Sequence, residues 1–211
     1  MDKAAVQNTS GSNPCTVTDV EETKIMIRIL PIWLTLIFPS TLLSQGGTLF
    51  IKQGMSLNRH MGSNFQIPPA SLAVFLPVLM LLVLIIYDRL LVPVCRRFTG
   101  NPRGITILQR MGVGMVLYTI AMVAAVITEM KRLDVVKSHG LAGDANAIVP
   151  RSMFILLPQY GVMGIAEAFL EVGKLEFFYD QAPESMQSLG TSLYAASLGV
   201  GAFSTVLYSP L

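Results

Sequence analysis

The sequence predicts an all-α protein, a multi-pass transmembrane helical bundle with about five spans, on three observations. Hydrophobic residues make up 52% of the 211 residues and charged residues only 13%, far from the composition of soluble domains. The mean hydropathy is high, at +0.58. The apolar residues are also clustered: stretches without Asp, Glu, Lys or Arg cover 29–51, 60–87, 111–128 and 185–211, and each can cross a bilayer.

The polar N-terminal segment is expected to lie outside the membrane. Residues 1–24 are rich in turn-forming residues and lack the apolar core of a secretory signal. We therefore expect 1–24 to be a largely disordered cytosolic linker, and 25–211 to form the transmembrane bundle.

Five spans are expected in order at 25–48, 67–92, 105–129, 152–178 and 185–208. The first contains Pro39, which is expected to kink the helix because proline removes a backbone donor. The second begins with Pro68 and Pro69, a rigid entrance to a helix. The third and fifth contain charge-free stretches, whereas the apolar stretch of the fourth, 152–170, carries one carboxylate, Glu167.

The positions of the basic residues predict the orientation in the membrane. If the N-terminus is cytosolic, alternation of the spans brings the following arginines into the loop between the second and third spans: Arg89, Arg96, Arg97, Arg103 and Arg110. Over the whole chain, more basic residues then stand on this side than on the other. Because basic residues favour the cytosolic side, the sequence predicts an integral membrane protein with a cytosolic N-terminus.

Glu167 is the most informative residue, because a charge deep in a span is costly unless it faces protein or water. Helical spacing places Tyr160, Gly164 and Glu171 on the same face, so we expect a cavity lined by Tyr160 and Gly164 in which Glu167 binds a proton or a cationic group. The alternative is a neutralised carboxyl bonded to another helix. Glu171 and Lys174, three residues apart and nearer the cytosolic edge, predict a local ion pair or a gate contact.

A second polar stripe lies on the first span. Thr41, Ser44 and Gln45 share a face with Thr48. This stripe could line a substrate path, or its side chains could bond neighbouring helices, since small polar residues often join membrane helices. Trp33 could be an interfacial anchor or a cavity wall, and its place near the cytosolic end of the same span favours the anchor.

Several classes of function are argued against. The sequence has no phosphate-binding loop, dinucleotide fingerprint, HExxH or GxSxG motif, so we expect no enzyme. Cys15 and Cys95 lie far apart, and His60 and His139 fall in loops, so no metal site or cofactor is expected. The net charge of +2 without a basic block argues against nucleic acid as a partner.

Nearly the whole chain carries strings that are shared with one family. They lie at 2–5, 15–22, 30–33, 67–72, 87–89, 96–100, 104–106 and 108–112, and the most specific are PQY at 158–160, AEAF at 166–169 and LEFFYDQAP at 175–183. In these strings the chain resembles the plant nitrate and peptide transporters, of the proton-dependent oligopeptide transporter branch of the major facilitator superfamily.

The resemblance implies that the five spans are the seventh to eleventh of twelve, an incomplete C-terminal bundle preceded by the central linker. It implies a symporter for nitrate, short peptides or related small solutes, working by alternating access in a plasma or vacuolar membrane. A proton gradient, rather than a cofactor, would supply the energy. Glu167 would be the tenth-span carboxylate of the substrate or proton site. The conformational charged loop would contain Asp88, Arg89, Arg96 and Arg97.

By the same resemblance, the half that carries the family's coupling motif and the twelfth span lie outside this sequence. A substrate site in this superfamily lies between two halves. The 211-residue chain alone is therefore expected not to transport. The alternative is a non-transporting, truncated membrane protein that pairs with a full-length relative and regulates it.

Overall fold

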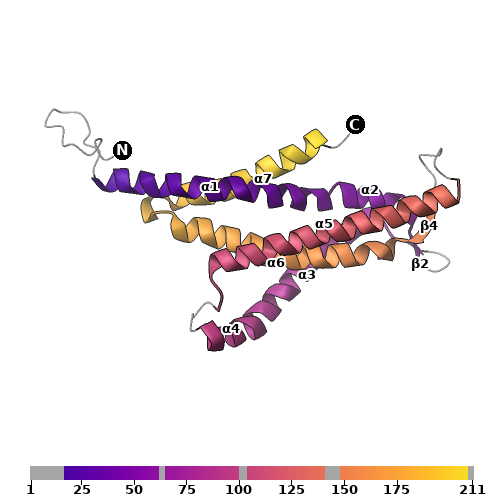
Figure 1. Ribbon diagram of the computed structural model, residues 1–211, viewed down its shortest axis with the longest axis horizontal. Helices are drawn as coiled ribbons and strands as arrows, with labels where there is room; N and C mark the ends of the chain where they lie inside the picture. The colour runs from indigo at the N-terminus through magenta and orange to yellow at the C-terminus, as the bar shows by residue number, and fades with distance from the viewer. Residues whose placement is uncertain (1–16, 62–64, 100–103, 141–147, 209–211) are drawn as a thin grey trace.

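Five long apolar helices form a bundle in this computed structural model (Figure 1). The structure describes residues 17–61, 65–99, 104–140 and 148–208. In these residues, the helical stretches long and apolar enough to cross a membrane are Thr18–Met55, Ala70–Arg97, Ile107–Ser138, Met153–Gln181 and Glu184–Leu207. The expected all-α, multi-pass fold class is therefore confirmed.

Several of the five stretches are built from more than one helical element. The elements are α1 (Val17–Gly46) and α2 (Leu49–Met55); the 3-10 helix η2 (Pro69–Val74), α3 (Phe75–Ile86), the π-helical turn η3 (Tyr87–Leu91) and α4 (Val92–Thr99); α5 (Ile107–Ser138); η5 (Met153–Leu156) and α6 (Leu157–Gln181); η6 (Glu184–Met186) and α7 (Gln187–Tyr208).

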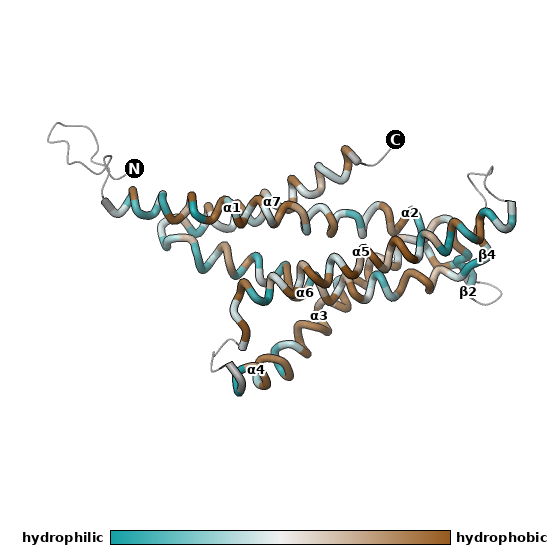
Figure 2. Tube along the Cα trace, viewed as in Figure 1, coloured by the Kyte–Doolittle hydropathy of each residue, from teal (hydrophilic) through white to brown (hydrophobic). Residues whose placement is uncertain are grey.

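The two ends of the bundle differ in character. At the end that holds α2, strand β1 (Leu57–Asn58) pairs in parallel with β4 (Val149–Ser152), and β2 (His60–Met61) pairs antiparallel with β3 (Phe65–Gln66). We call this the strand end; its short strands were not expected. The opposite end holds α4 and the beginning of α5, and we call it the arginine end. Figure 2 shows hydrophilic segments near β2 and β4, and hydrophobic ones along α3 and α5.

The helix limits differ from the expected spans at two places. Residues 17–24 belong to α1 and are helical, so the expectation of a disordered linker is wrong for them; residues 1–16 lie outside the described residues. α1 also continues through Pro39 to Gly46. α5 runs to Ser138 rather than ending near Glu129, because Glu129 pairs with Arg132 along the same helix.

The central helix of the bundle is α6. It contacts α5, α3, α7 and α1, and Figure 1 shows it running beside α5. In its most apolar window 56% of the residues are buried, against 17–28% in the other four stretches. Its fully buried side chains include Met163, Leu170 and Phe178. α6 is therefore the helix whose side chains are most enclosed by the rest of the described bundle.

α1 and α7 form a second close pair, in which backbone meets backbone. A Cβ on Gly201 of α7 would lie 2.5 Å from the carbonyl carbon of Ser40, so only glycine fits at this crossing. Trp33 joins the same pair, because its indole N–H donates to the Leu193 carbonyl at 2.8 Å. The polar atom of Trp33 therefore holds α1 against α7, and its place as an interfacial anchor stays a prediction.

Candidate functional site

Lys174 of α6 is fully buried and sits at a meeting point of three helices. Its Nζ lies 2.5 Å from Glu171 Oε1 and donates to Ser40 Oγ of α1 at 3.0 Å. Tyr194 of α7 donates its hydroxyl to Glu171 Oε2 at 3.3 Å, and Lys174 Nζ lies 5.8 Å from the centre of the Tyr194 ring. We call Glu171, Lys174, Ser40 and Tyr194, together with Glu167, the α6 polar cluster.

The expected pairing of Glu171 with Lys174 is present, but its surroundings differ from an ordinary helix-surface pair. The side chain of Glu171 is 8% exposed and that of Lys174 is 0% exposed. An ion pair removed from water must be supported by further hydrogen bonds, because desolvation of both charges is costly. Ser40 and Tyr194 supply that support from α1 and α7. The pair therefore joins three helices inside the bundle.

Glu167 lies one helical turn before Glu171 and has no comparable support. It is half-buried, and its Oε2 is buried without a hydrogen-bond partner among the described residues. Glu171 and Lys174 both lie within its electrostatic reach. In this arrangement Glu171 is a compensated carboxylate and Glu167 an uncompensated one.

Tyr160 and Gly164, the expected cavity residues, are buried in helix contacts. The Tyr160 ring packs edge-on against Phe50 of α2 at 5.3 Å between ring centres, and its hydroxyl has no partner among the described residues. A Cβ on Gly164 would lie 2.9 Å from Leu79 Cδ2, so this glycine lets α3 approach α6 closely. The structure thus places both residues on the Glu167 side of α6, packed against different neighbours.

The polar stripe of α1 makes mostly local hydrogen bonds. Thr41 Oγ1 donates to the Ile37 carbonyl at 3.0 Å, and Ser44 Oγ to the Ser40 carbonyl at 3.2 Å. Gln45 reaches another helix, since its Nε2 donates to Thr205 Oγ1 of α7 at 3.5 Å. These contacts favour the helix-packing interpretation of the stripe over the substrate-path interpretation.

The charged loop expected at the arginine end is placed on the surface. Asp88 and Arg89 belong to the π-helical turn η3, Arg96 and Arg97 to α4, and all four are exposed. The structure brings them to one end of the bundle, although it does not bring them into the α6 polar cluster.

Arg110 departs from its expected place in that loop. The side chain of Thr106 accepts from the Gln109 backbone N–H at 3.3 Å, and that of Gln109 accepts from the Thr106 N–H at 3.2 Å, a reciprocal cap that starts α5 before Arg110. Arg110 is consequently 8% exposed. It donates to the Ala168 carbonyl at 3.3 Å and lies 4.4 Å from the centre of the Tyr87 ring.

Another polar network ties the strand end together. Glu129 accepts from Arg132 Nε and from Gln53 Nε2, each at 2.9 Å. Arg132 also donates to Ser56 Oγ at 3.3 Å, and Gln159 donates to Gln53 Oε1 at 3.1 Å. The network joins α2, α5 and α6, and so connects three helices far from Glu167.

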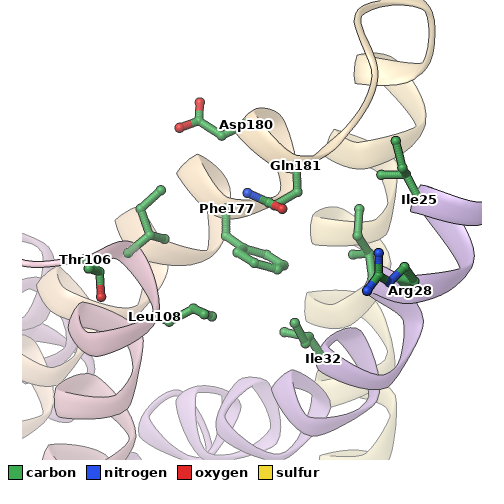
Figure 3. Close-up of a pocket in the computed structure, with 10 residues that line it drawn as sticks. Ile25, Arg28, Ile32, Thr106, Leu108, Phe177, Asp180 and Gln181 are labelled. Carbon is green, nitrogen blue, oxygen red and sulfur yellow. The ribbon is translucent and has the colours of Figure 1, made fainter. Parts of the chain in front are cut away.

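A cavity of about 590 Å³ opens at the arginine end between α1, α5 and α6. Figure 3 shows Ile25, Arg28 and Ile32 facing Phe177 and Gln181 across it. Its walls are mostly apolar, and the residues lining it include none of the candidate site residues. In the described ranges, no group of three or more His, Cys, Asp or Glu side chains is arranged to hold a metal ion.

Three residues near the candidate site were not singled out from the sequence. Ser40 and Tyr194 complete the buried ion pair, and Tyr118 of α5 is fully buried with a hydroxyl that has no partner in the described part of the chain. Tyr118 lies within electrostatic reach of both Glu171 and Glu167. Hydroxyl residues are ordinary in membrane helices, so only the packing of α1, α5 and α7 against α6 reveals them.

The bundle has the fold of a membrane transporter of the POT type. The crystal structure of an auto-inhibited POT family peptide transporter matches it with a TM-score of 0.71 at 22% identity, over 90% of this chain and 33% of the other. The match extends to sequence, because residues 1–211 fit the profile of the POT family (PTR2). The chain belongs to the POT family, a family of transporters rather than enzymes.

Relatives in Arabidopsis thaliana are considerably closer in sequence. The chain is 55% identical to Protein NRT1/PTR FAMILY 5.3 over 196 residues, which cover 92% of this chain and 33% of the relative. It is 50% identical to Protein NRT1/PTR FAMILY 5.2 over 205 residues, or 96% of this chain and 35% of the relative. The chain thus spans about a third of the length of these relatives, with 33% and 35% covered.

Proposed function

We propose that this chain forms part of a proton-coupled symporter for nitrate, short peptides or related small solutes. The complete protein works by alternating access and takes its energy from the proton gradient. Within the chain, Glu167 is the group on α6 that takes up a proton or the cationic group of a substrate.

One observation carries the assignment of Glu167 on the central helix: among the described residues its buried Oε2 has neither a hydrogen-bond partner nor an ion-pair partner, whereas Glu171 Oε1, which also lacks a hydrogen bond, is paired with Lys174. Burying a carboxylate without a partner is strongly unfavourable, so such a group binds a proton or a cation. Glu171 lacks this requirement because Lys174 already neutralises it. The two carboxylates of the cluster therefore have different roles.

The transport cycle belongs to a protein with two halves. In the superfamily that the chain resembles, the substrate site lies at the midplane between halves that rock against each other. The α6 polar cluster supplies one wall of such a site. The excess of basic residues at the arginine end supports a cytosolic position for this end, and the family resemblance supports a plasma or vacuolar membrane.

The test uses a full-length chimera in which this chain replaces the matching third of NRT1/PTR FAMILY 5.3. Glu167→Gln should lower proton-driven uptake of labelled nitrate or dialanine on the order of tenfold or more, because loss of a few kcal/mol of coupling has that effect on a rate. Membrane insertion should remain. Glu184→Gln removes an exposed carboxylate outside α6 and should leave uptake unchanged. Normal uptake by Glu167→Gln at normal surface abundance would remove Glu167 from the mechanism.

A further inference from the structure

We propose that Lys174 is a positioning residue that sets the pH at which Glu167 exchanges its proton, by holding Glu171 as a neutralised ion pair. This inference rests on the proposed function of Glu167. It concerns a different residue and a different measurement from the transport test.

The contacts divide the two carboxylates of the cluster unequally. Glu171 has Lys174 Nζ at 2.5 Å on one oxygen and the Tyr194 hydroxyl at 3.3 Å on the other. Lys174 is held in place by Ser40 and is fully enclosed. Glu167 has neither contact on its buried oxygen. Lys174 is therefore assigned to Glu171, and its charge acts on Glu167 from one helical turn further along α6.

The other helices packed on α6 bring few groups that could replace Lys174. α5 contributes Tyr118, which is uncharged, and Arg110, which is charged. The Arg110 guanidinium already donates to the Ala168 carbonyl and pairs with Glu176. α7 contributes Tyr194, and α3 has no titratable residue over Phe75–Ile86. α1 has none over 29–51. Among the described residues, the charged groups nearest to Glu167 along α6 are Glu171 and Lys174, and both act on it.

Counting charges gives the direction of the effect. With Glu167 protonated, the negative charge of Glu171 and the positive charge of Lys174 cancel. When Glu167 releases its proton to water, one net negative charge remains. Without Lys174 the same release would leave two carboxylates about 6 Å apart along the helix, and their repulsion would oppose it. Without the charge of Glu171, Lys174 would instead favour the release.

The experiment follows the protonated-carboxyl stretching band of Glu167 by infrared spectroscopy, in the purified chimera in lipid nanodiscs, as pH is varied. Subtracting the spectrum of the Glu167→Gln form isolates the band. In Lys174→Gln the band should persist to higher pH, and in Glu171→Gln it should disappear at lower pH, each by about one pH unit or more. For each variant, the spectrum of the same variant with Glu167→Gln added is subtracted. A signal from Glu171 is present in both spectra and therefore cancels.

Two controls separate charge from structure. Lys174→Arg keeps the positive charge and should leave the midpoint close to that of the unmodified protein. Glu129→Gln breaks another Glu–basic pair of spacing three, which lies at the strand end, and should not move the midpoint. If Lys174→Gln fails to fold, Glu171→Gln still decides, since a lower midpoint supports the proposal and an unchanged one overturns it.

Opposite shifts in the two variants support the proposal, because a general loosening of the bundle would move both in the same direction. Equal shifts, or none, overturn it. The outcome is independent of the transport test: normal uptake by Glu167→Gln together with opposite shifts would refute the proposed function and leave Lys174 as the residue that tunes Glu167. Loss of uptake by Glu167→Gln without shifts in the two variants would support the proposed function and refute the role of Lys174.

Discussion

Arg110 shows how one side chain can join three helices. It belongs to α5, donates to the Ala168 carbonyl of α6, and stacks its guanidinium on Tyr87 of η3. Glu176 lies 3.7 Å away and balances its charge. Guanidinium is suited to this role because it donates in several directions while stacking on an aromatic ring.

Replacing Arg110 should therefore weaken the bundle. Arg110→Met is expected to lower the free energy of unfolding by about 2 kcal/mol, since it removes charged hydrogen bonds in a buried site. Arg110→Lys should recover only part of this, because an ammonium group lacks the planar fork. Arg89→Met, at an exposed position, should change stability by less than about 0.5 kcal/mol. Denaturant unfolding in detergent micelles measures all three; equal stability of Arg110→Met and Arg89→Met would contradict the assignment.

For single residues, the sequence predicts a functional role when the residue type conflicts with its neighbours in the sequence. Glu167 could be found because it interrupts an apolar run, and its partner-free oxygen agrees with that conflict. The burial of Arg110 was missed, although Thr106 and Gln109 form a capping signature just before it. Tyr118 carries no comparable signal, since its position depends on how α5 meets α6.

At the scale of helices, the crossing of α1 and α7 depends on one glycine. A Cβ at residue 201 would meet the backbone of Ser40 and Thr41 at 2.5–2.7 Å, and backbone cannot move aside as a flexible side chain can. Gly199, two residues earlier on the same helix, has nothing within 4 Å of its Cβ position. The two glycines therefore form a matched pair for a test of packing.

Gly201→Ala is expected to lower the free energy of unfolding by about 1–3 kcal/mol, the usual effect of an overpacked contact. Gly199→Ala should leave stability unchanged or raise it by up to about 1 kcal/mol, because alanine is the better helix former. Thermal unfolding in detergent, followed by circular dichroism, compares them. A Gly201→Ala form as stable as Gly199→Ala would show that α1 and α7 do not pack as described.

Hydropathy located the middle of each helix better than its ends. The third span was expected to stop near Glu129, where charged residues begin, but α5 continues because Glu129 and Arg132 satisfy each other on the helix surface. Likewise, α1 includes residues 17–24 despite their polarity. Charge marks where a helix leaves the apolar layer, whereas backbone hydrogen bonds and side-chain pairs decide where it ends.

For the molecule as a whole, the 211-residue chain by itself should show no uptake. Reconstituted into vesicles with a proton gradient, it is expected to accumulate neither labelled nitrate nor dialanine, because the site needs a second half to rock against. The full-length chimera in the same vesicles is the positive control. Proton-dependent accumulation by the chain alone would contradict the two-half mechanism.

The five-span fold could be predicted from composition and clustering, since each apolar stretch needs only its own length to be recognised. The family could be predicted from strings such as LEFFYDQAP, and the match over residues 1–211 confirms it. The central place of α6 could not be predicted from the sequence, because it depends on contacts between helices that are distant in sequence. The membrane and the orientation stay predictions.

The pairing of α1 with α7 has a consequence for how the chain is made. Trp33 and its partner Leu193 are 160 residues apart. At a synthesis rate of about 5–20 residues per second, α1 spends roughly ten to thirty seconds in the membrane before α7 emerges. Its hydroxyls are bonded to carbonyls of the same helix meanwhile, as at Ser40, Thr41 and Ser44. α1 can thus wait in lipid with these hydroxyls satisfied until α7 arrives to pair with it.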